Sequence, residues 1–178
     1  MPSIHSRHRP SIFLIGPMGA GKTTIGRQLA RQLNRDFYDS DRVIEERTGA
    51  DIPLIFDKEG EAGFRRREAA IIDELTQLDD IVLATGGGAV LDEYNRRHLS
   101  GRGMVVYLSS DLDSLLERTR KDKNRPLLHA EEPPEVILRR LLDQRDPLYR
   151  ESADFIVDTG RHSIRHVIKA IIQQLEQH

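Results

Sequence analysis

Residues 16–23, GPMGAGKT, fit the pattern G-x-x-x-x-G-K-[ST] at every fixed position. Glycines allow the backbone to curl so that several N–H groups point at phosphate oxygens. Lys22 can reach the β- and γ-phosphates of a nucleotide, and the Thr23 hydroxyl can ligate Mg²⁺. The stretch therefore predicts a phosphate-binding loop. The structural alternative is a glycine-rich turn with an incidental lysine, and the apolar run before the turn and the amphipathic run after it argue against that alternative.

Two carboxylates follow in FYDSD, residues 37–41. If this stretch ends a strand, Asp39 and Asp41 point to the same side, because strand side chains alternate with a period of two. Asp39 can hold Mg²⁺, and Asp41 can accept a proton from an attacking hydroxyl. The structural alternative is that Asp41 caps the following helix while Asp39 ends the strand.

These groups must be positioned by elements that alternate along the chain. Short apolar runs predict strands, and apolar residues at helical spacing predict helices. The predicted strands are 11–16, 36–39, 81–85, 104–108 and 154–158, and the predicted helices are 22–33, 41–48, 61–78, 111–120, 134–144 and 162–176. Strands that are apolar throughout and alternate with helices favour a parallel sheet covered on both faces, with ligands beyond the carboxyl ends of the strands.

Composition narrows the class of protein. The chain has 178 residues, no cysteine, and a net charge of 27 − 29 = −2. We expect one domain over 11–178 after a flexible tail at 1–10, with no nucleic-acid partner. The absence of cysteine excludes disulfides, thiolate metal sites and cysteine nucleophiles. No apolar run approaches the roughly 20 residues of a membrane span, and the first ten residues do not resemble a secretory signal, so we expect a cytoplasmic protein.

Two other nucleotide-dependent classes fit poorly. A GTPase needs an NKxD tetrapeptide, which does not occur, although DKEG at 57–60 matches the short DxxG pattern. A motor-type ATPase carries an apolar strand that ends in a magnesium-binding aspartate. The third predicted strand ends instead in Thr85, and FIVD at 155–158 lies late in the chain. Asp39 therefore remains the candidate metal ligand.

Six short motifs in order carry a resemblance to a known family. They are GPMGAGKTT, FYDSD, GFRRRE at 63–68, ATGGG at 84–88, RPLL at 125–128 and RDPLY at 145–149. With these motifs the chain resembles the shikimate kinases, small relatives of the nucleoside monophosphate kinases, from residue 11 onward. The resemblance implies a P-loop α/β sandwich whose five-stranded parallel sheet has the order 2-3-1-4-5. It also implies transfer of the ATP γ-phosphoryl group to the 3-hydroxyl of shikimate, a step toward aromatic amino acids.

The resemblance assigns the acceptor site to charged residues and glycines. Arg65 and Arg145 would bind the carboxylate of shikimate, because the planar guanidinium makes paired hydrogen bonds to a carboxylate. Asp41 would bind the ring hydroxyls, and Gly87 and Gly88 would donate backbone N–H groups. Without the resemblance, the arginines could be surface cations and the glycines a flexible turn. Glu68, three residues after Arg65, is expected to orient Arg65. The acceptor region would span about 39–67.

The resemblance also assigns the nucleotide site. The catalytic residues would be Lys22, Asp41 and Arg125, and Mg²⁺ would be held by Thr23 and Asp39. The ATP-contacting residues would be Gly19, Ala20, Gly21, Lys22, Thr23, Thr24, Arg118, Arg125 and His162.

The charged, proline-rich segment 118–134 is expected to form a lid that carries Arg125 to the γ-phosphate. The alternative is a solvated loop with an idle arginine. Arg118 would pack on adenine, and the opposite wall would come from 159–163, where His162 or Arg161 would supply the contact. His162 and His166 stand four apart, but a metal role lacks an evident third ligand.

The expected partners are shikimate and ATP, with Mg²⁺, in a monomer that contacts no membrane. Two rivals remain open. Another small-metabolite kinase on the same scaffold, such as a gluconate kinase, would share the phosphate loop, although two arginines with ATGGG favour a cyclic carboxylate. A nucleotide-dependent module without catalysis would be favoured by loss of Lys22, Asp41 or Arg125, and all three are present.

Overall fold

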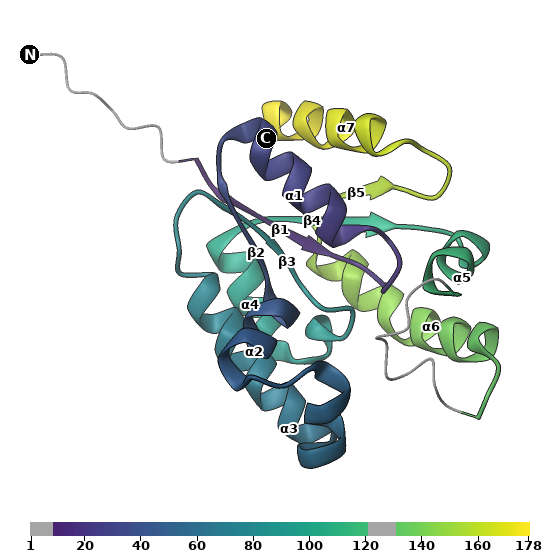
Figure 1. Cartoon of the computed structure of the whole chain (residues 1–178). Helices are drawn as coiled ribbons and strands as arrows, with labels where there is room; N and C mark the ends of the chain where they lie inside the picture. The colour runs from purple at the N-terminus through teal and green to yellow at the C-terminus, as the bar shows by residue number, and fades with distance from the viewer. Residues whose placement is uncertain (1–8, 121–130) are drawn as a thin grey trace, which may run out of the picture.

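Five parallel strands form a single sheet in the order β2-β3-β1-β4-β5, which confirms the predicted topology. The computed structural model describes residues 9–120 and 131–178. The strands are β1 Ser11–Ile15, β2 Asp36–Asp39, β3 Ile81–Ala84, β4 Gly103–Ser109 and β5 Phe155–Asp158. Because all the strands run the same way, the carboxyl ends of β2, β3 and β1 meet at one edge of the sheet (Figure 1).

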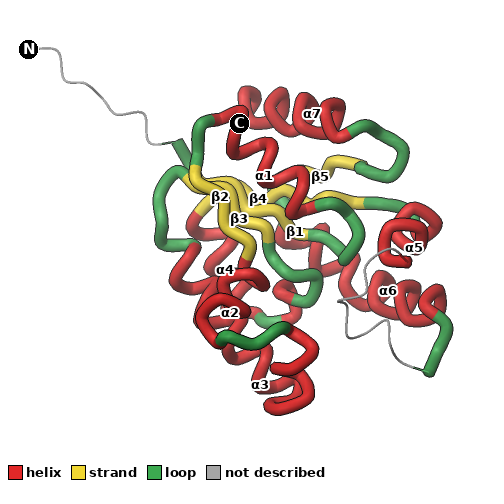
Figure 2. Tube along the Cα trace, in the orientation of Figure 1, coloured by secondary structure: helices red, strands yellow, loops and turns green. Residues whose placement is uncertain are grey.

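Helices cover both faces of the sheet, as Figure 2 shows. They are α1 Lys22–Leu33, α2 Ser40–Thr48, α3 Ile52–Leu75, α4 Glu93–Arg102, α5 Leu112–Arg120, α6 Pro134–Ser152 and α7 Ile164–Gln177, with a 3₁₀ turn, η1, at Ala89–Leu91. Helices α1 and α7 lie together on one side, and α2, α3 and α4 lie on the other (Figure 1). In the ranges 9–120 and 131–178, no helix combines the length and the apolar character that a membrane crossing requires.

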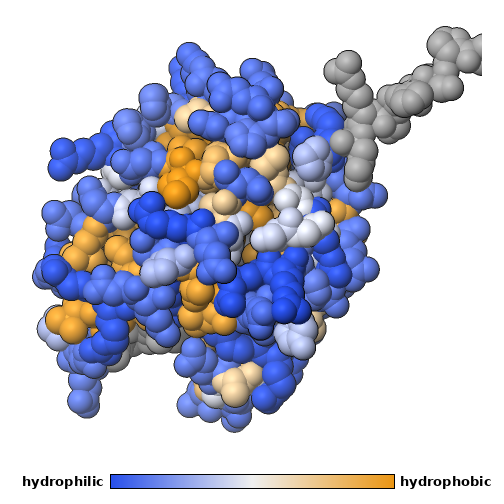
Figure 3. Space-filling model, turned by 180° about the vertical axis from the view of Figure 1, so that it is seen from behind, coloured by the Kyte–Doolittle hydropathy of each residue, from blue (hydrophilic) through white to orange (hydrophobic). Residues whose placement is uncertain are grey.

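The core is split into two layers by the sheet. Ile12 and Leu14 of β1 pack toward α1 and α7, whereas Phe13 and Ile15 pack toward α3 and α4. Both sets are fully buried, which explains why four consecutive residues of the strand are apolar rather than alternate ones. On the outer face shown in Figure 3, hydrophobic residues form separate patches among hydrophilic ones.

The helix boundaries differ from the prediction in three places. Helix α3 begins at Ile52 rather than at residue 61 and bends at Gly60, which has φ 72° and ψ 179°. Helix α6 does not end at 144. It continues through Pro147, because the buried Tyr149 and Ser152 extend its packed face and outweigh the missing proline N–H. Helix α4 was not predicted.

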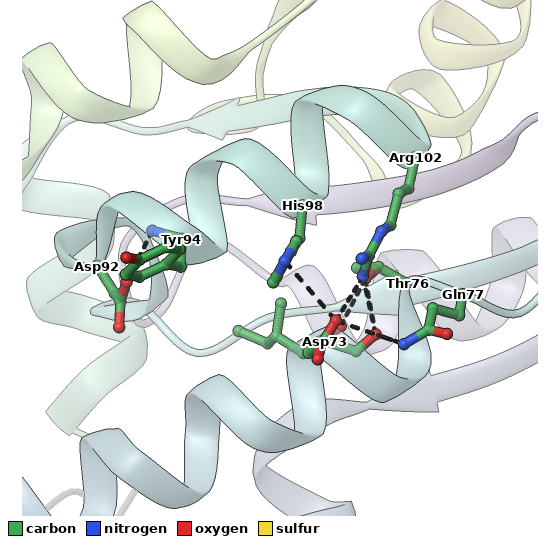
Figure 4. Close-up of polar contacts among 8 residues, drawn as sticks. Asp73, Thr76, Gln77, Asp92, Tyr94, His98 and Arg102 are labelled. Atoms are coloured by element: carbon green, nitrogen blue, oxygen red, sulfur yellow. Dashed lines mark hydrogen bonds and ion pairs between the residues drawn. The ribbon is translucent and has the colours of Figure 1, made fainter.

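Helix α4 is fastened to α3 by a group of polar contacts that Figure 4 shows. Nη1 of Arg102 donates to Oδ1 of Asp73 at 2.7 Å, to the Asp73 carbonyl at 2.9 Å and to Oγ1 of Thr76 at 2.9 Å. Nε2 of His98 lies 3.7 Å from the same Asp73 oxygen. The hydrogen bond from Arg102 lowers the pKa of Asp73. These contacts involve charged side chains rather than an apolar stripe, so hydrophobic periodicity could not predict α4.

Helix α1 approaches the sheet closely at a glycine, Gly26. A Cβ at Gly26 would lie 2.7 Å from Cε2 of Phe37 and 3.1 Å from Cδ1 of Leu14. We therefore expect Gly26→Ala to lower the free energy of unfolding by about 1–2 kcal/mol, because overpacking outweighs the gain of about 1 kcal/mol in helix propensity. Urea unfolding measures this difference.

Gly101, in α4, is the matched control, because a Cβ there would meet nothing within 4 Å. Gly101→Ala should leave stability unchanged or raise it by about 0.5 kcal/mol. If Gly26→Ala stabilised the protein as much as Gly101→Ala, the close approach of α1 to Phe37 would be wrong.

Candidate active site

The predicted phosphate loop joins β1 to α1 and is shaped by glycines in a conformation that other residues rarely adopt. Gly16, Gly19 and Gly21 have φ of 148°, 85° and 92°. No side chain caps the first turn of α1, so its amides face the loop. Nζ of the buried Lys22 donates to the carbonyls of Gly16 at 2.5 Å and Pro17 at 2.8 Å. Ala20 is buried, and Thr24 is exposed on the first turn of the helix.

Asp39 stands where β2 ends, beside the phosphate loop. Its Oδ2 accepts a hydrogen bond from the Thr23 hydroxyl at 2.6 Å, and its Oδ1 accepts from the amides of Asp41 at 3.0 Å and Arg42 at 3.3 Å. Asp39 is thus both the N-cap of α2 and a neighbour of Thr23. Two hard oxygens therefore sit side by side at the loop, and this donor pair suits Mg²⁺, which keeps several waters and takes its other oxygens from phosphate.

Asp41 reaches the site by a different route from the one expected. It does not share the strand with Asp39. It lies in the first turn of α2, and the cap that the structural alternative gave to Asp41 belongs to Asp39. Both carboxylates nevertheless line one cavity of about 380 Å³, which opens beyond the carboxyl ends of the central strands.

The glycine triplet 86–88 follows β3 and lines the same cavity. None of the three glycines has a positive φ, so the triplet is not needed for an unusual backbone conformation. At Gly86 and Gly88 it is needed because there is no room for a side chain, whereas at Gly87 the neighbouring atoms are close but do not overlap. A Cβ at Gly86 would lie 2.8 Å from Oδ1 of Asp41, one at Gly87 would lie 3.4 Å from Nη1 of Arg145, and one at Gly88 would overlap the guanidinium of Arg65.

Arg65 and Arg145 enter the cavity from α3 and α6, and both are largely withdrawn from solvent. Nη1 of Arg65 donates to Oε1 of Glu68 at 2.8 Å, which confirms the contact expected from their spacing. Arg145 is 5 % exposed. Within the part of the chain that the structure describes, Nε of each arginine and Oε2 of Glu68 lack a hydrogen-bond partner. Buried guanidinium donors without acceptors favour an anionic ligand such as a carboxylate.

Glu68 is the most buried ionisable group of the cavity, at 1 % exposed. Burial raises its pKa, and the neighbouring Arg65 offsets only part of that rise. The proton of Glu68 is therefore held to a higher pH than in a solvated glutamate. The sequence singled out Glu68 only as a partner of Arg65, because burial of that face cannot be read from the charged stretch that surrounds it.

The cavity also has an apolar wall that sequence reasoning missed. Ile52, Phe56 and Phe64 of α3 line it. Phe64 belongs to the motif GFRRRE, but Ile52 and Phe56 precede the predicted start of the helix. The available signal was Asp51, whose side chain accepts from the amide of Leu54 and caps α3.

The proposed adenine side of the site is built around Arg118. Its Nη1 donates to the carbonyl of Gly19 at 3.0 Å, and its Nη2 donates to the carbonyl of Thr159 at 3.0 Å. Arg118 therefore bridges the phosphate loop and the segment after β5. His162 stacks on His166 with ring centroids 4.4 Å apart, and over 9–120 and 131–178 no three His, Cys, Asp or Glu residues are grouped to hold a metal. Arg125 and most of the expected lid lie outside the described residues, as does the tail at 1–8.

Comparisons with known proteins agree on one family. The model of the family "Shikimate kinase" matches residues 18–176. A shikimate kinase of Methylococcus capsulatus is 58 % identical over 171 residues, which cover 96 % of this chain and 95 % of that protein. The structure of a shikimate kinase from Acinetobacter baumannii in complex with shikimate superposes with a TM-score of 0.92 at 53 % identity, covering 95 % of this chain and 94 % of that one.

A gluconokinase structure from Sinorhizobium meliloti is also similar, with a TM-score of 0.59 at 17 % identity over 96 % of this chain and 94 % of that one. This likeness shows a shared fold alone. The family model instead matches residues 18–176, which include most of the phosphate loop, the glycine triplet, Arg65 and Arg145, and the two shikimate kinase relatives are more than 50 % identical to this chain. The chain belongs to the shikimate kinase family of ATP-dependent phosphotransferases.

Proposed function

We propose that the chain transfers the γ-phosphoryl group of ATP to the 3-hydroxyl of shikimate, with the acceptor bound in the cavity between α2, α3 and the glycine triplet. The observation that carries this assignment is the convergence of two largely buried guanidinium groups and one aspartate beside a phosphate loop. A small ring that carries a carboxylate and several hydroxyls matches those groups. The solved relative from Acinetobacter baumannii, which holds shikimate, supports the same ligand.

In this proposal Arg65 and Arg145 bind the carboxylate end of the acceptor. Each offers several N–H donors in a fixed plane, and burial strengthens each hydrogen bond by excluding water. The N–H groups of Gly87 and Gly88 add donors, since neither amide makes a hydrogen bond to another described residue. A flexible open chain such as gluconate would lose more conformational entropy on binding these donors than a rigid cyclic carboxylate.

Asp41 lies at the reacting end of the cavity, between the phosphate loop and the glycine triplet. It orients the acceptor hydroxyl by accepting its hydrogen bond. As the new bond between this oxygen and the γ-phosphorus forms and the bond to the bridging oxygen of ADP breaks, the hydroxyl proton passes to Asp41. Phosphoryl transfer needs little help from a base. An Asp41→Asn variant with a near-full kcat would limit Asp41 to orienting the hydroxyl.

Lys22, with the first-turn amides of α1, binds the β- and γ-phosphates and stabilises their charge. Arg125 is proposed to reach the γ-phosphate from the lid, and Arg118 and His162 to border adenine. Thr23 and Asp39 would hold Mg²⁺, which neutralises phosphate charge when bound. The contacts of the Lys22 ammonium with the loop carbonyls are exchanged for contacts with phosphate oxygens when ATP binds.

We place the protein in the cytoplasm, where ATP is available, and as a monomer. The exposed large hydrophobic residues of the described chain are scattered over separate elements: Leu54, Leu78, Tyr94, Val136, Ile156 and Ile164. Such scattered residues do not form the continuous apolar patch of an obligate dimer. Cell fractionation and sedimentation test these two assignments.

The experiment that tests the function is ADP release with ATP and Mg²⁺, with and without shikimate. Gluconate and nucleoside monophosphates are the control acceptors. Release should depend on shikimate alone, stop with EDTA and return with excess Mg²⁺. Protein that binds ATP but is not stimulated by shikimate would retain the nucleotide site and overturn the acceptor assignment.

Replacing either buried arginine should weaken shikimate binding. Arg145→Lys keeps the charge but loses the planar fork, so we expect KM for shikimate to rise by about ten- to a hundredfold while KM for ATP changes little. Steady-state kinetics with each substrate varied measure both values. Arg65→Lys should behave in the same way.

Arg66, which neighbours Arg65 in sequence but is exposed, is the matched control. Arg66→Lys should leave both KM values within about twofold of wild type, as for other exposed substitutions. Equal effects of Arg66→Lys and Arg65→Lys would show that net charge, rather than the cavity geometry, controls binding.

Glu68 predicts a pH-dependent stability. Because burial raises its pKa in the folded protein, the folded state holds this proton to a higher pH than the unfolded chain. The contribution of Glu68 to stability is complete below its unfolded pKa of about 4.3 and is lost as pH rises through the folded pKa. Glu68→Gln cannot ionise. We therefore expect the free energy of unfolding of wild type, minus that of Glu68→Gln, to decrease as the pH is raised from about 4 to about 8. Urea titrations without ligands measure this difference. A constant difference would mean that Glu68 has an ordinary pKa.

A further inference from the structure

Tyr149 is a buried side chain of α6 that the assigned site does not include. Only 1 % of its surface is exposed, yet its hydroxyl donates a hydrogen bond to the carbonyl of Gly87 at 2.5 Å. The guanidinium of Arg145, one helical turn earlier, lies beside the same hydroxyl. A phenol has one donor and can accept hydrogen bonds as well, so both contacts are satisfied at once. One oxygen therefore joins the glycine triplet to the buried arginine of the cavity.

The peptide bond explains why the Gly87 contact matters. The carbonyl of Gly87 and the N–H of Gly88 belong to the same planar peptide unit and point in opposite directions. When Tyr149 holds the carbonyl, it also fixes the direction of the Gly88 amide. Among the described residues that amide has no partner, and Gly88 lines the cavity.

A second aromatic ring fixes the position of the Tyr149 ring. It packs on Tyr107 of β4 with centroids 4.9 Å apart and an interplanar angle of 35°. The Tyr107 hydroxyl donates to Oδ1 of Asp146 at 2.6 Å, and Nε of Arg150 donates to the other oxygen of Asp146 at 2.8 Å. Burial raises the pKa of Tyr149, so its hydroxyl keeps the proton that it donates.

Side chains of helix α4 donate hydrogen bonds to the backbone of the two residues that follow the glycine triplet. Nδ2 of Asn95 donates to the carbonyl of Ala89 at 3.0 Å, and Nη1 of Arg96 donates to the carbonyl of Val90 at 2.7 Å. Helix α4 is fastened to α3 by the contacts of Figure 4. These contacts fix Ala89 and Val90, which follow the glycine triplet. Tyr149 instead hydrogen-bonds to Gly87, which lines the cavity.

We propose that Tyr149 is a positioning residue for the acceptor site, whose hydroxyl sets both the Gly87–Gly88 peptide and the Arg145 guanidinium in the orientation that binds a carboxylate-bearing ring. The proposal rests on the proposed function. It predicts that the hydroxyl acts on binding of the acceptor and not on binding of the nucleotide, because neither of its two partners belongs to the phosphate loop.

Tyr149→Phe removes the hydroxyl and keeps the ring. We expect KM for shikimate to rise about tenfold, with KM for ATP within about twofold of wild type and a smaller change in kcat. Tyr107→Phe is the matched control, because it removes the other hydroxyl of the same ring pair, which donates to Asp146 and not to a residue that lines the cavity. Tyr107→Phe should lower stability in urea and leave KM for shikimate unchanged.

A double-mutant cycle supplies a second readout. If the hydroxyl acts partly through Arg145, the combined Tyr149→Phe and Arg145→Lys variant should raise KM for shikimate by less than the product of the two single effects. A wild-type KM for shikimate in Tyr149→Phe, or equal KM changes in Tyr149→Phe and Tyr107→Phe, would overturn the positioning role while leaving the function intact. A wild-type protein that shows no shikimate-dependent turnover would overturn both.

Discussion

The site depends on the parallel placement of β3 between β2 and β1. Parallel pairing brings the three carboxyl ends to one edge, so the phosphate loop, Asp39 and the glycine triplet meet although they are far apart in sequence. The register matters as much as the order. Asp39 pairs with Ala84, and Leu14 also pairs with Ala84, so the three strands reach the edge at the same level. A shift by two residues would separate Asp39 from Thr23.

The chain uses glycine in two physically different ways within this one site. In the phosphate loop, Gly16, Gly19 and Gly21 provide backbone conformations with positive φ. In the triplet after β3, the backbone conformation is ordinary, and glycine is required because charged side chains press against the chain. The first kind shapes an anion-binding curl. The second allows Asp41, Glu68 and the two arginines to surround the cavity closely.

How much could be predicted from the sequence depended on whether the signal was local. The phosphate loop was predictable, since an apolar strand, the glycine pattern and an amphipathic helix lie in one stretch, whereas the sheet order was predicted only through the family resemblance. The contact of Arg65 with Glu68 followed from helical spacing. The position of Asp41 in the cavity did not follow from spacing. It depends on Asp39 being both the last residue of β2 and the N-cap of α2. Helix α4, the continuation of α6 past Pro147 and the role of Tyr149 depend on tertiary contacts, which leave no periodic trace in the sequence.

The ammonium of Lys22, folded back onto the carbonyls of Gly16 and Pro17, has a consequence for nucleotide capture. Those carbonyls would repel one another in a tight curl, and a cation held among them stabilises the curved shape without a nucleotide. A loop held in this way is preorganised, so in the function that we propose little conformational entropy would remain to be lost when ATP binds. Binding then amounts to an exchange of oxygen partners around one resident cation, so that the same charge keeps the empty loop curved and attracts the anion that fills it.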